Sequence, residues 1–124
     1  MNIDSKLKEI RYEDYIWIIY IIIIFMSWYN NGLERKYFLY NNILAKEKYR
    51  KVLIIIFTIL LLVYIYFFKS SLDSIHNLKD NDSINKKKLT ELAGIASLFI
   101  LVSGVIFLYV AYMDYDIEVE LAFN

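Results

Sequence analysis

The sequence predicts an all-α membrane protein with three transmembrane helices, amphipathic interfacial helical segments and a short strand-like C-terminal tail. Hydrophobic residues make up 59% of the 124 residues, above the roughly 45–50% of a soluble domain. They gather into three blocks, whereas almost all of the 14 basic and 14 acidic residues lie between or outside these blocks. This segregation is typical of a chain that crosses a lipid bilayer.

Composition narrows the possible functions. The formal net charge is zero, so we expect no nucleic-acid partner. The absence of cysteine excludes disulfides, thiolate metal sites and cysteine nucleophiles. Without proline and with only three glycines, the helices are expected to be long and straight. The abundance of Ile, Asn, Lys and Tyr is typical of AT-rich genes, as in a low-GC bacterium or its phages.

Residues 1–14 are predicted to form an amphipathic N-terminal segment on the membrane surface. Ile3, Leu7 and Ile10 recur at helical spacing among basic and acidic residues. The acidic residues argue against a cleaved signal peptide, so we expect the segment to remain in the mature protein.

The first apolar block, residues 15–29, is predicted to be transmembrane helix 1. Fifteen helical residues rise only about 22 Å, less than the roughly 30 Å of the hydrocarbon core. Tyr15 and Trp17 at one end, and Trp28 and Tyr29 at the other, are aromatic side chains that favour the two headgroup regions. They are expected to anchor this short span at both surfaces.

Residues 30–51 are predicted to form a basic interfacial loop and helix. Asn30, Asn31 and Gly32 tolerate the left-handed conformation that ends a helix, so we expect the chain to reverse there. From Leu33 onward no helix breaker follows for more than thirty residues. A helix starting at Leu33 is therefore expected to continue into the second span.

The second apolar block, residues 52–68, is predicted to be transmembrane helix 2. It has no charge, and its length excludes a strand despite its many β-branched residues. Residues 69–88 form a polar connection. Apolar residues at helical spacing predict that helix 2 extends about two turns into this connection, before a loop at 80–83.

The third block, residues 89–113, is predicted to be transmembrane helix 3. Unlike the other two, it carries a stripe of small side chains, which let membrane helices approach closely. The stripe and its neighbours are Thr90, Ala93, Gly94, Ser97, Gly104 and Ala111. We predict that these residues are the helix-packing and interaction surface, either within the chain or toward a partner.

Residues 114–124 form an acidic tail in which charged and apolar residues alternate. A period of two over eight residues predicts a strand, which would need a partner. The acidic residues are Asp114, Asp116, Glu118 and Glu120. With three spans the tail lies on the same side as the loop 30–51, whose basic residues are Arg35, Lys36, Lys46, Lys48, Arg50 and Lys51.

We expect no catalytic, cofactor-binding or metal-binding residues. No Asp, Glu, Lys, Arg or His lies within 15–29, 52–68 or 92–113, where a transporter commonly has them. Phosphate loops, nucleophile elbows and paired metal-binding histidines are also missing from the sequence. The single histidine, His76, is expected to be a surface residue. The segment starting at Asp80 resembles a calcium loop only in its first residues, so we reject that assignment.

These observations favour a non-enzymatic structural or interaction subunit of the cell membrane. Its partners would be the lipid bilayer and either further copies of itself or another membrane protein, contacted through helix 3. The alternative is a pore-forming or membrane-perturbing protein, as holins are, and a small oligomeric transporter is a weaker one. The N-terminus and the second connection carry eight Lys and Arg against six in the first loop, which favours a cytoplasmic N-terminus in a multi-pass protein.

The charges of the tail and the first loop predict a diffuse electrostatic attraction between them. The loop has four more basic than acidic residues, which equals the four carboxylates of the tail. Deletion of residues 114–124 is therefore expected to increase the protease accessibility of residues 30–51. Unchanged cleavage of the loop in the truncated protein would contradict this attraction.

Overall fold

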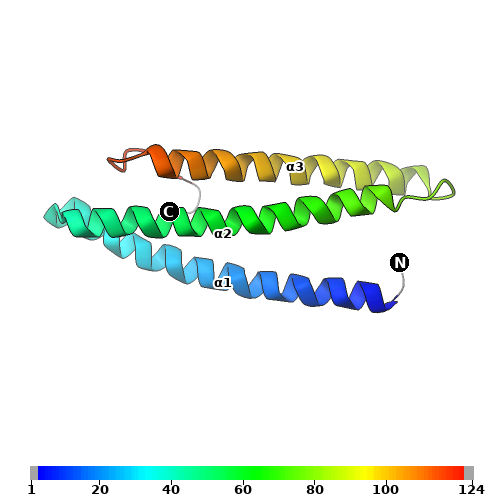
Figure 1. The fold of residues 1–124 in the computed structure, drawn as a ribbon, viewed down its shortest axis with the longest axis horizontal. Helices are drawn as coiled ribbons and strands as arrows, with labels where there is room; N and C mark the ends of the chain where they lie inside the picture. Colours follow the sequence, from blue (N-terminus) through cyan, green and yellow to red (C-terminus); the bar gives the residue numbers. More distant parts are fainter. Residues whose placement is uncertain (1–2, 122–124) are drawn as a thin grey trace. The chain divides into compact units, whose positions relative to one another are not determined.

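The computed structural model describes residues 3–121, which form three long helices and no strand (Figure 1). The helices are α1 (Ile3–Tyr40), α2 (Ile43–His76) and α3 (Ile84–Met113). Each is long and apolar enough to cross a membrane. The described residues divide into two compact units, 3–56 and 57–121, so that α2 contributes to both. The expectation of an all-α chain with three long apolar helices is confirmed.

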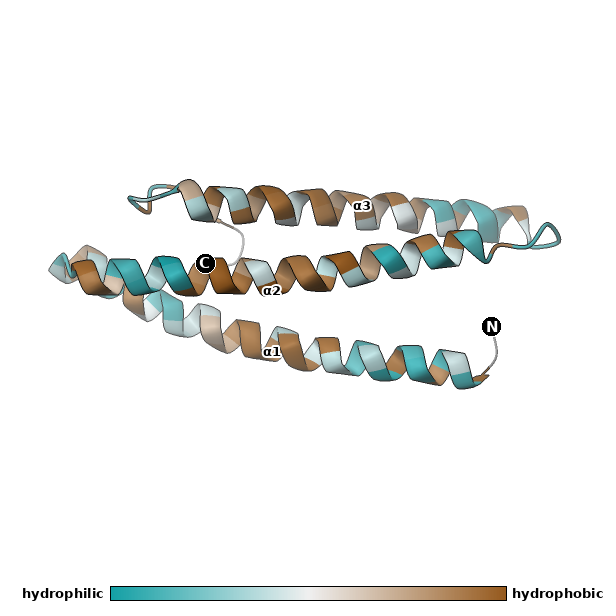
Figure 2. Ribbon diagram, in the orientation of Figure 1, coloured by the Kyte–Doolittle hydropathy of each residue, from teal (hydrophilic) through white to brown (hydrophobic). Residues whose placement is uncertain are grey.

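All three helices are longer than a bilayer is thick. They contain 38, 34 and 30 residues, which at 1.5 Å per residue gives about 57, 51 and 45 Å. Figure 2 shows a long apolar stretch in each helix, with hydrophilic residues in the first turns of α1 and α3 and on both sides of the apolar stretch of α2. The polar segments next to the apolar blocks are thus continuations of the same helices.

The predicted N-terminal segment 1–14 is therefore not a separate helix. Met1 and Asn2 lie outside the described residues, and from Ile3 onward the segment is the first part of α1. The predicted extension of helix 2 is confirmed, because α2 continues past the apolar block to His76.

The prediction that the chain reverses at Asn30–Gly32 is wrong. α1 continues through these residues, and the reversal lies at Asn41 and Asn42, where Asn41 has a φ of 52°. The Asn42 side chain accepts a hydrogen bond from the backbone N–H of Ala45 at 3.1 Å, as an N-cap does. Both asparagine pairs have turn-forming chemistry, but continuation of α1 buries Asn30 inside the unit.

In the unit 3–56, α1 and the first part of α2 bury residues at spacings of three, four and seven. Such spacings place the buried side chains on one face of each helix, as in coiled-coil packing. The buried residues are Ile16, Ile23, Asn30 and Leu33 of α1, and Ala45, Tyr49, Leu53 and Ile56 of α2.

The acidic tail does not form the predicted strand within 114–121, and residues 122–124 of the prediction lie outside the described residues. The Asp114 carboxylate accepts hydrogen bonds from the backbone N–H groups of Glu118 at 3.0 Å and Val119 at 2.9 Å. Ile117 has a φ of 56°, which is incompatible with a strand. The local hydrogen bonds to Asp114 thus give a turn where the alternating pattern predicts an extended chain.

Candidate functional site

In the unit 57–121, the small side chains of α3 allow close contact with α2. A Cβ atom added to Gly94 would lie 2.7 Å from Cδ1 of Ile75. One added to Gly104 would lie 2.8 Å from Cδ2 of Tyr64 and 3.4 Å from Cδ1 of Leu61. Both glycines are buried. The two helices approach at these positions because α3 has no side chain there.

A hydrogen bond between two serines joins the same pair of helices. The Oγ atoms of Ser71 and Ser97 are 2.7 Å apart, and Ser97 Oγ also donates to the carbonyl oxygen of Ala93 at 3.0 Å. A hydroxyl has one proton, so Ser71 donates to Ser97. The rings of Phe57 and Phe107 add an aromatic contact with centroids 5.8 Å apart. The α2–α3 contact therefore combines close packing, one polar bond and one ring pair.

The remaining residues of the predicted stripe have different surroundings. Ala111 is only 1% exposed. Thr90 is half-buried, and its hydroxyl donates to the carbonyl of Lys86 in its own helix. Ala93 is exposed. Gly94, Ser97 and Gly104 thus pack against α2 of the same chain, which is one of the two uses that the sequence predicts for the stripe.

In the unit 3–56, a polar contact lies between α1 and α2. Asn30 is fully buried, and its Nδ2 donates to the backbone carbonyl of Tyr49 at 3.3 Å. Its Oδ1 is buried without a hydrogen-bond partner, as are Ser27 Oγ and Glu34 Oε2 one turn away on either side. Polar side chains of this kind join helices where the surroundings are apolar.

The sequence pattern predicts a turn at Asn30 and therefore no helix contact there. A signal for it does exist in the sequence. Ile16, Ile23 and Asn30 are seven residues apart, and this spacing places all three on one helix face. A single asparagine in such a position usually fixes the register of two helices.

The basic residues predicted for the first loop lie on α1 and α2 themselves, near the turn that joins them. The Nζ of Lys46 is 5.3 Å from the ring centroid of Tyr37, and that of Lys48 is 5.5 Å from the ring centroid of Tyr29. The predicted attraction between these residues and the tail stays a prediction, because residues 114–121 of the tail belong to the other unit.

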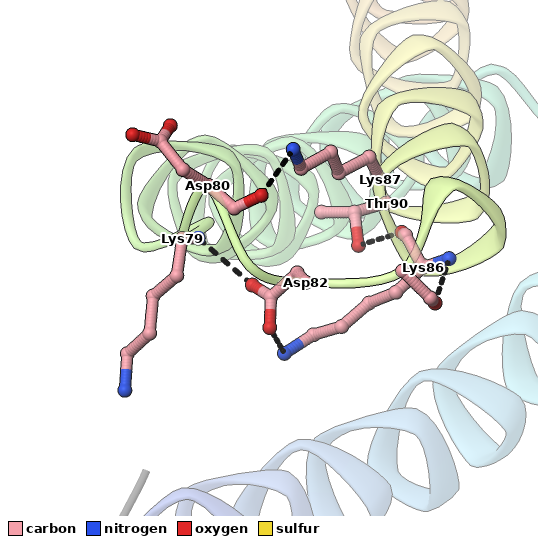
Figure 3. A network of polar contacts seen from close by, with 7 residues as sticks. Lys79, Asp80, Asp82, Lys86, Lys87 and Thr90 are labelled. Carbon is pink, nitrogen blue, oxygen red and sulfur yellow. Dashed lines mark hydrogen bonds and ion pairs between the residues drawn. The ribbon is translucent and has the colours of Figure 1, made fainter.

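The connection between α2 and α3 is held by its own polar groups (Figure 3). The Asp82 carboxylate accepts from the backbone N–H of Lys79 at 2.8 Å and from Lys86 Nζ at 3.3 Å. Mainly the Lys79 N–H, and then the Lys86 ammonium, hold the pKa of Asp82 below its usual value of 3.8.

Ser83 Oγ accepts a hydrogen bond from the Lys86 backbone N–H at 3.0 Å and caps α3. Lys87 Nζ donates to the Asp80 carbonyl at 3.1 Å.

The described residues contain no group of three or more His, Asp or Glu that could hold a metal ion. His76 is exposed at the end of α2. No protein-family model, curated protein or solved structure matches the chain. The helix contacts and the exposed surfaces of the two units are the features from which a function is proposed below.

The two glycines of α3 are expected to differ in their tolerance of alanine. Gly104→Ala meets the edge of the Tyr64 ring, a rigid group that has to move as a whole, so we expect it to lower the unfolding free energy by about 1–3 kcal/mol. Gly94→Ala meets only the flexible end of Ile75, and the gain of about 1 kcal/mol in helix propensity offsets that contact. Reversible unfolding in mixed micelles measures both.

Gly32→Ala is the matched control, because nothing lies within 4 Å of a Cβ atom at Gly32. It is expected to stabilise α1 by up to about 1 kcal/mol. Equal destabilisation by alanine at Gly94 and Gly104 would contradict the close approach of α3 to Tyr64.

Asn30→Ala is expected to weaken the α1–α2 contact, because it removes the hydrogen bond to the Tyr49 carbonyl. Interhelical side-chain hydrogen bonds in membranes contribute about 0.6 kcal/mol on average and up to about 1.7 kcal/mol. Asn31→Ala is the control, since Asn31 is exposed on the same helix. If both variants had the same unfolding free energy, Asn30 would not be a helix contact.

Proposed function

We propose that the chain is a multi-pass membrane protein that acts as a non-enzymatic structural or interaction subunit. In this proposal it assembles through α3 with further copies of itself or with another membrane protein. One observation carries the proposal. In the most apolar 18-residue stretch of each helix, only 11% is buried in α3, against 22% in α1 and 28% in α2. Most of the apolar surface of α3 is thus left for lipid or for a partner helix.

The outer face of α3 offers a second place for close helix packing. Ala96 and Ser103 are exposed and seven residues apart, so they lie on one face of the helix. At 3.6 residues per turn, this face points about 130° away from the one that carries Gly94 and Gly104, which contact α2. We assign assembly to the outer face because the inner glycines are already packed against α2.

The chemistry of the spans supports a role without catalysis or ion transport. The segments 15–29, 52–68 and 92–113 contain no Asp, Glu, Lys, Arg or His. In the proposed arrangement these segments are the membrane-embedded parts of α1, α2 and α3. The N-terminus is placed in the cytoplasm by the excess of basic residues on that side.

Insertion and orientation are tested by labelling single cysteines, since the chain has none of its own. Ser5→Cys and Asn42→Cys lie at opposite ends of α1 and its following turn. We expect an impermeant thiol reagent to label Asn42→Cys in intact cells and to label Ser5→Cys only after permeabilisation. The reverse pattern would invert the orientation, and labelling of both in intact cells would contradict the spans.

Assembly is tested by enlarging the small side chains of the outer face. We expect Ala96→Leu combined with Ser103→Leu to lower the yield of crosslinked oligomers several-fold in membranes, because leucine keeps a partner helix away. Val105→Leu, at another exposed position of α3, is the control and should leave the yield unchanged. An unchanged yield in the double variant would refute assembly through this face. Loss of membrane potential on expression would instead favour a pore-forming protein.

A further inference from the structure

Three exposed lysines lie around Tyr29 in the unit 3–56, and we call Lys36, Lys48 and Lys51 the lysine patch. The Nζ of Lys48 is 5.5 Å from the ring centroid of Tyr29. Lys36 is seven residues after Tyr29, which places both on the same face of α1. Lys51 is one turn after Lys48 on α2. The lysine patch therefore combines residues of both helices beside one aromatic ring.

The positive charges of the lysine patch are not neutralised by ion pairs. Within residues 3–121, none of the three lysines forms an ion pair or a hydrogen bond. The Tyr29 ring leaves the charge of Lys48 in place. Glu47 is one turn before Lys51, so three lysines and one glutamate leave two net positive charges. Glu34 is two residues before Lys36 and therefore lies on the opposite side of α1.

The lysine patch lies at the depth of the headgroups if the chain spans the membrane as proposed above. From Tyr15, where the apolar block of α1 begins, to Lys36 the helix rises about 32 Å, close to the roughly 30 Å of the hydrocarbon core. On α2, Lys51 directly precedes the charge-free segment 52–68. Figure 2 shows hydrophilic turns in α2 immediately before its long apolar stretch. Both helices thus place their patch lysines at the edge of the hydrocarbon.

Helix geometry brings the three lysine side chains toward one level. The Cα–Cβ bonds of a helix tilt toward its N-terminus. Because the chain reverses between α1 and α2, Lys36 leans back toward the apolar block, whereas Lys48 and Lys51 lean away from it. The hydrogen bond of 3.3 Å from the Asn30 side chain to the Tyr49 carbonyl holds the two helices in this register.

A phosphate group in the headgroup layer fits this arrangement. Lysine binds phosphate as a compact point charge, and basic residues beside a membrane span attract the headgroups of anionic lipids. A tyrosine ring such as that of Tyr29 favours the same layer. Lysine is depleted from protein–protein interfaces, so three exposed lysines favour a lipid over a protein partner.

We propose that the lysine patch binds the phosphate of an anionic lipid in the chain's own bilayer. The lipid next to this side of the α1–α2 pair would then be anionic in preference to neutral. This inference rests on the proposed membrane-spanning function and adds a lipid of defined charge to its partners.

Quenching of Trp28 fluorescence by brominated lipid tests the proposal, because Trp28 precedes Tyr29 and is 72% exposed. The second tryptophan of the chain is removed as Trp17→Phe. The full-length protein is placed in phosphatidylcholine bilayers that contain either brominated phosphatidylcholine or brominated phosphatidylglycerol at the same mole fraction. Bromine quenches only at short range, so the signal reports the lipids beside Trp28. We expect brominated phosphatidylglycerol to quench more strongly.

Neutralising the lysine patch should remove this preference. We expect Lys48→Gln to lower it by up to about fivefold, since each basic residue near an anionic surface contributes about that factor. Adding Lys36→Gln and Lys51→Gln should abolish it. Lys46→Gln is the matched control, because it removes the same charge two residues away, over the Tyr37 ring on the other side of α2. It should leave the preference unchanged.

Four results would overturn the proposal. Equal quenching by the two brominated lipids would exclude a preference, and an equal loss in Lys46→Gln and Lys48→Gln would indicate diffuse attraction without a site. Displacement of the brominated phosphatidylglycerol by inorganic phosphate at constant ionic strength would assign the patch to free phosphate. A preference that arises only in Glu118→Gln with Glu120→Gln would assign the patch to the acidic tail.

Failure of the proposed function gives a different result from failure of the lysine patch. If neither brominated lipid quenched Trp28, the membrane-spanning arrangement and the patch would be refuted together. Equal quenching by both lipids would instead confirm that Trp28 lies beside lipid and refute the patch alone.

Discussion

In the proposed membrane arrangement, the demand that backbone polar groups be satisfied inside the chain determines most of this structure. Within hydrocarbon an unpaired N–H or C=O costs several kcal/mol, so a single span must be a helix. The chain contains no proline to interrupt such a helix. Its two connections, at Asn41–Asn42 and between His76 and Ile84, both lie outside the apolar blocks. Each helix can thus complete its hydrogen bonds before the chain turns.

If the helices lie in lipid as proposed, their packing needs forces other than the hydrophobic effect. Lipid is as apolar as leucine, so burying one apolar helix against another gains little from removing it from lipid. The contacts in each unit fit this restriction. Gly104 lets α3 reach the Tyr64 ring, and the Asn30 side chain reaches a backbone carbonyl of α2. Large aliphatic side chains then fill the space around these close contacts and polar bonds.

The sequence predicts the three helices and the end of α3 at Met113, but not the end of α1. Long charge-free blocks identify spans because the bilayer thickness fixes the length they need. Asn30–Asn31 and Asn41–Asn42 have similar local propensities, but Asn30 is buried and bonded to Tyr49, whereas the turn forms at the exposed pair Asn41–Asn42. In the tail, a period of two predicts a strand, yet the Asp114 carboxylate accepts hydrogen bonds from the backbone N–H groups of Glu118 and Val119. In both cases a contact several residues away overrides the local pattern.

The same reasoning explains why the two hairpin ends differ in what they leave exposed. Between α2 and α3, carboxylate and carbonyl oxygens of the connection bind Lys86 and Lys87, and the carboxylate of Asp82 neutralises part of that charge. Near the α1–α2 turn, Lys48 lies over the Tyr29 ring, and a ring leaves the full positive charge in place. The α2–α3 connection thus uses its charges to order itself. At the α1–α2 turn, the side chains of Phe38, Leu39 and Leu44 stay exposed.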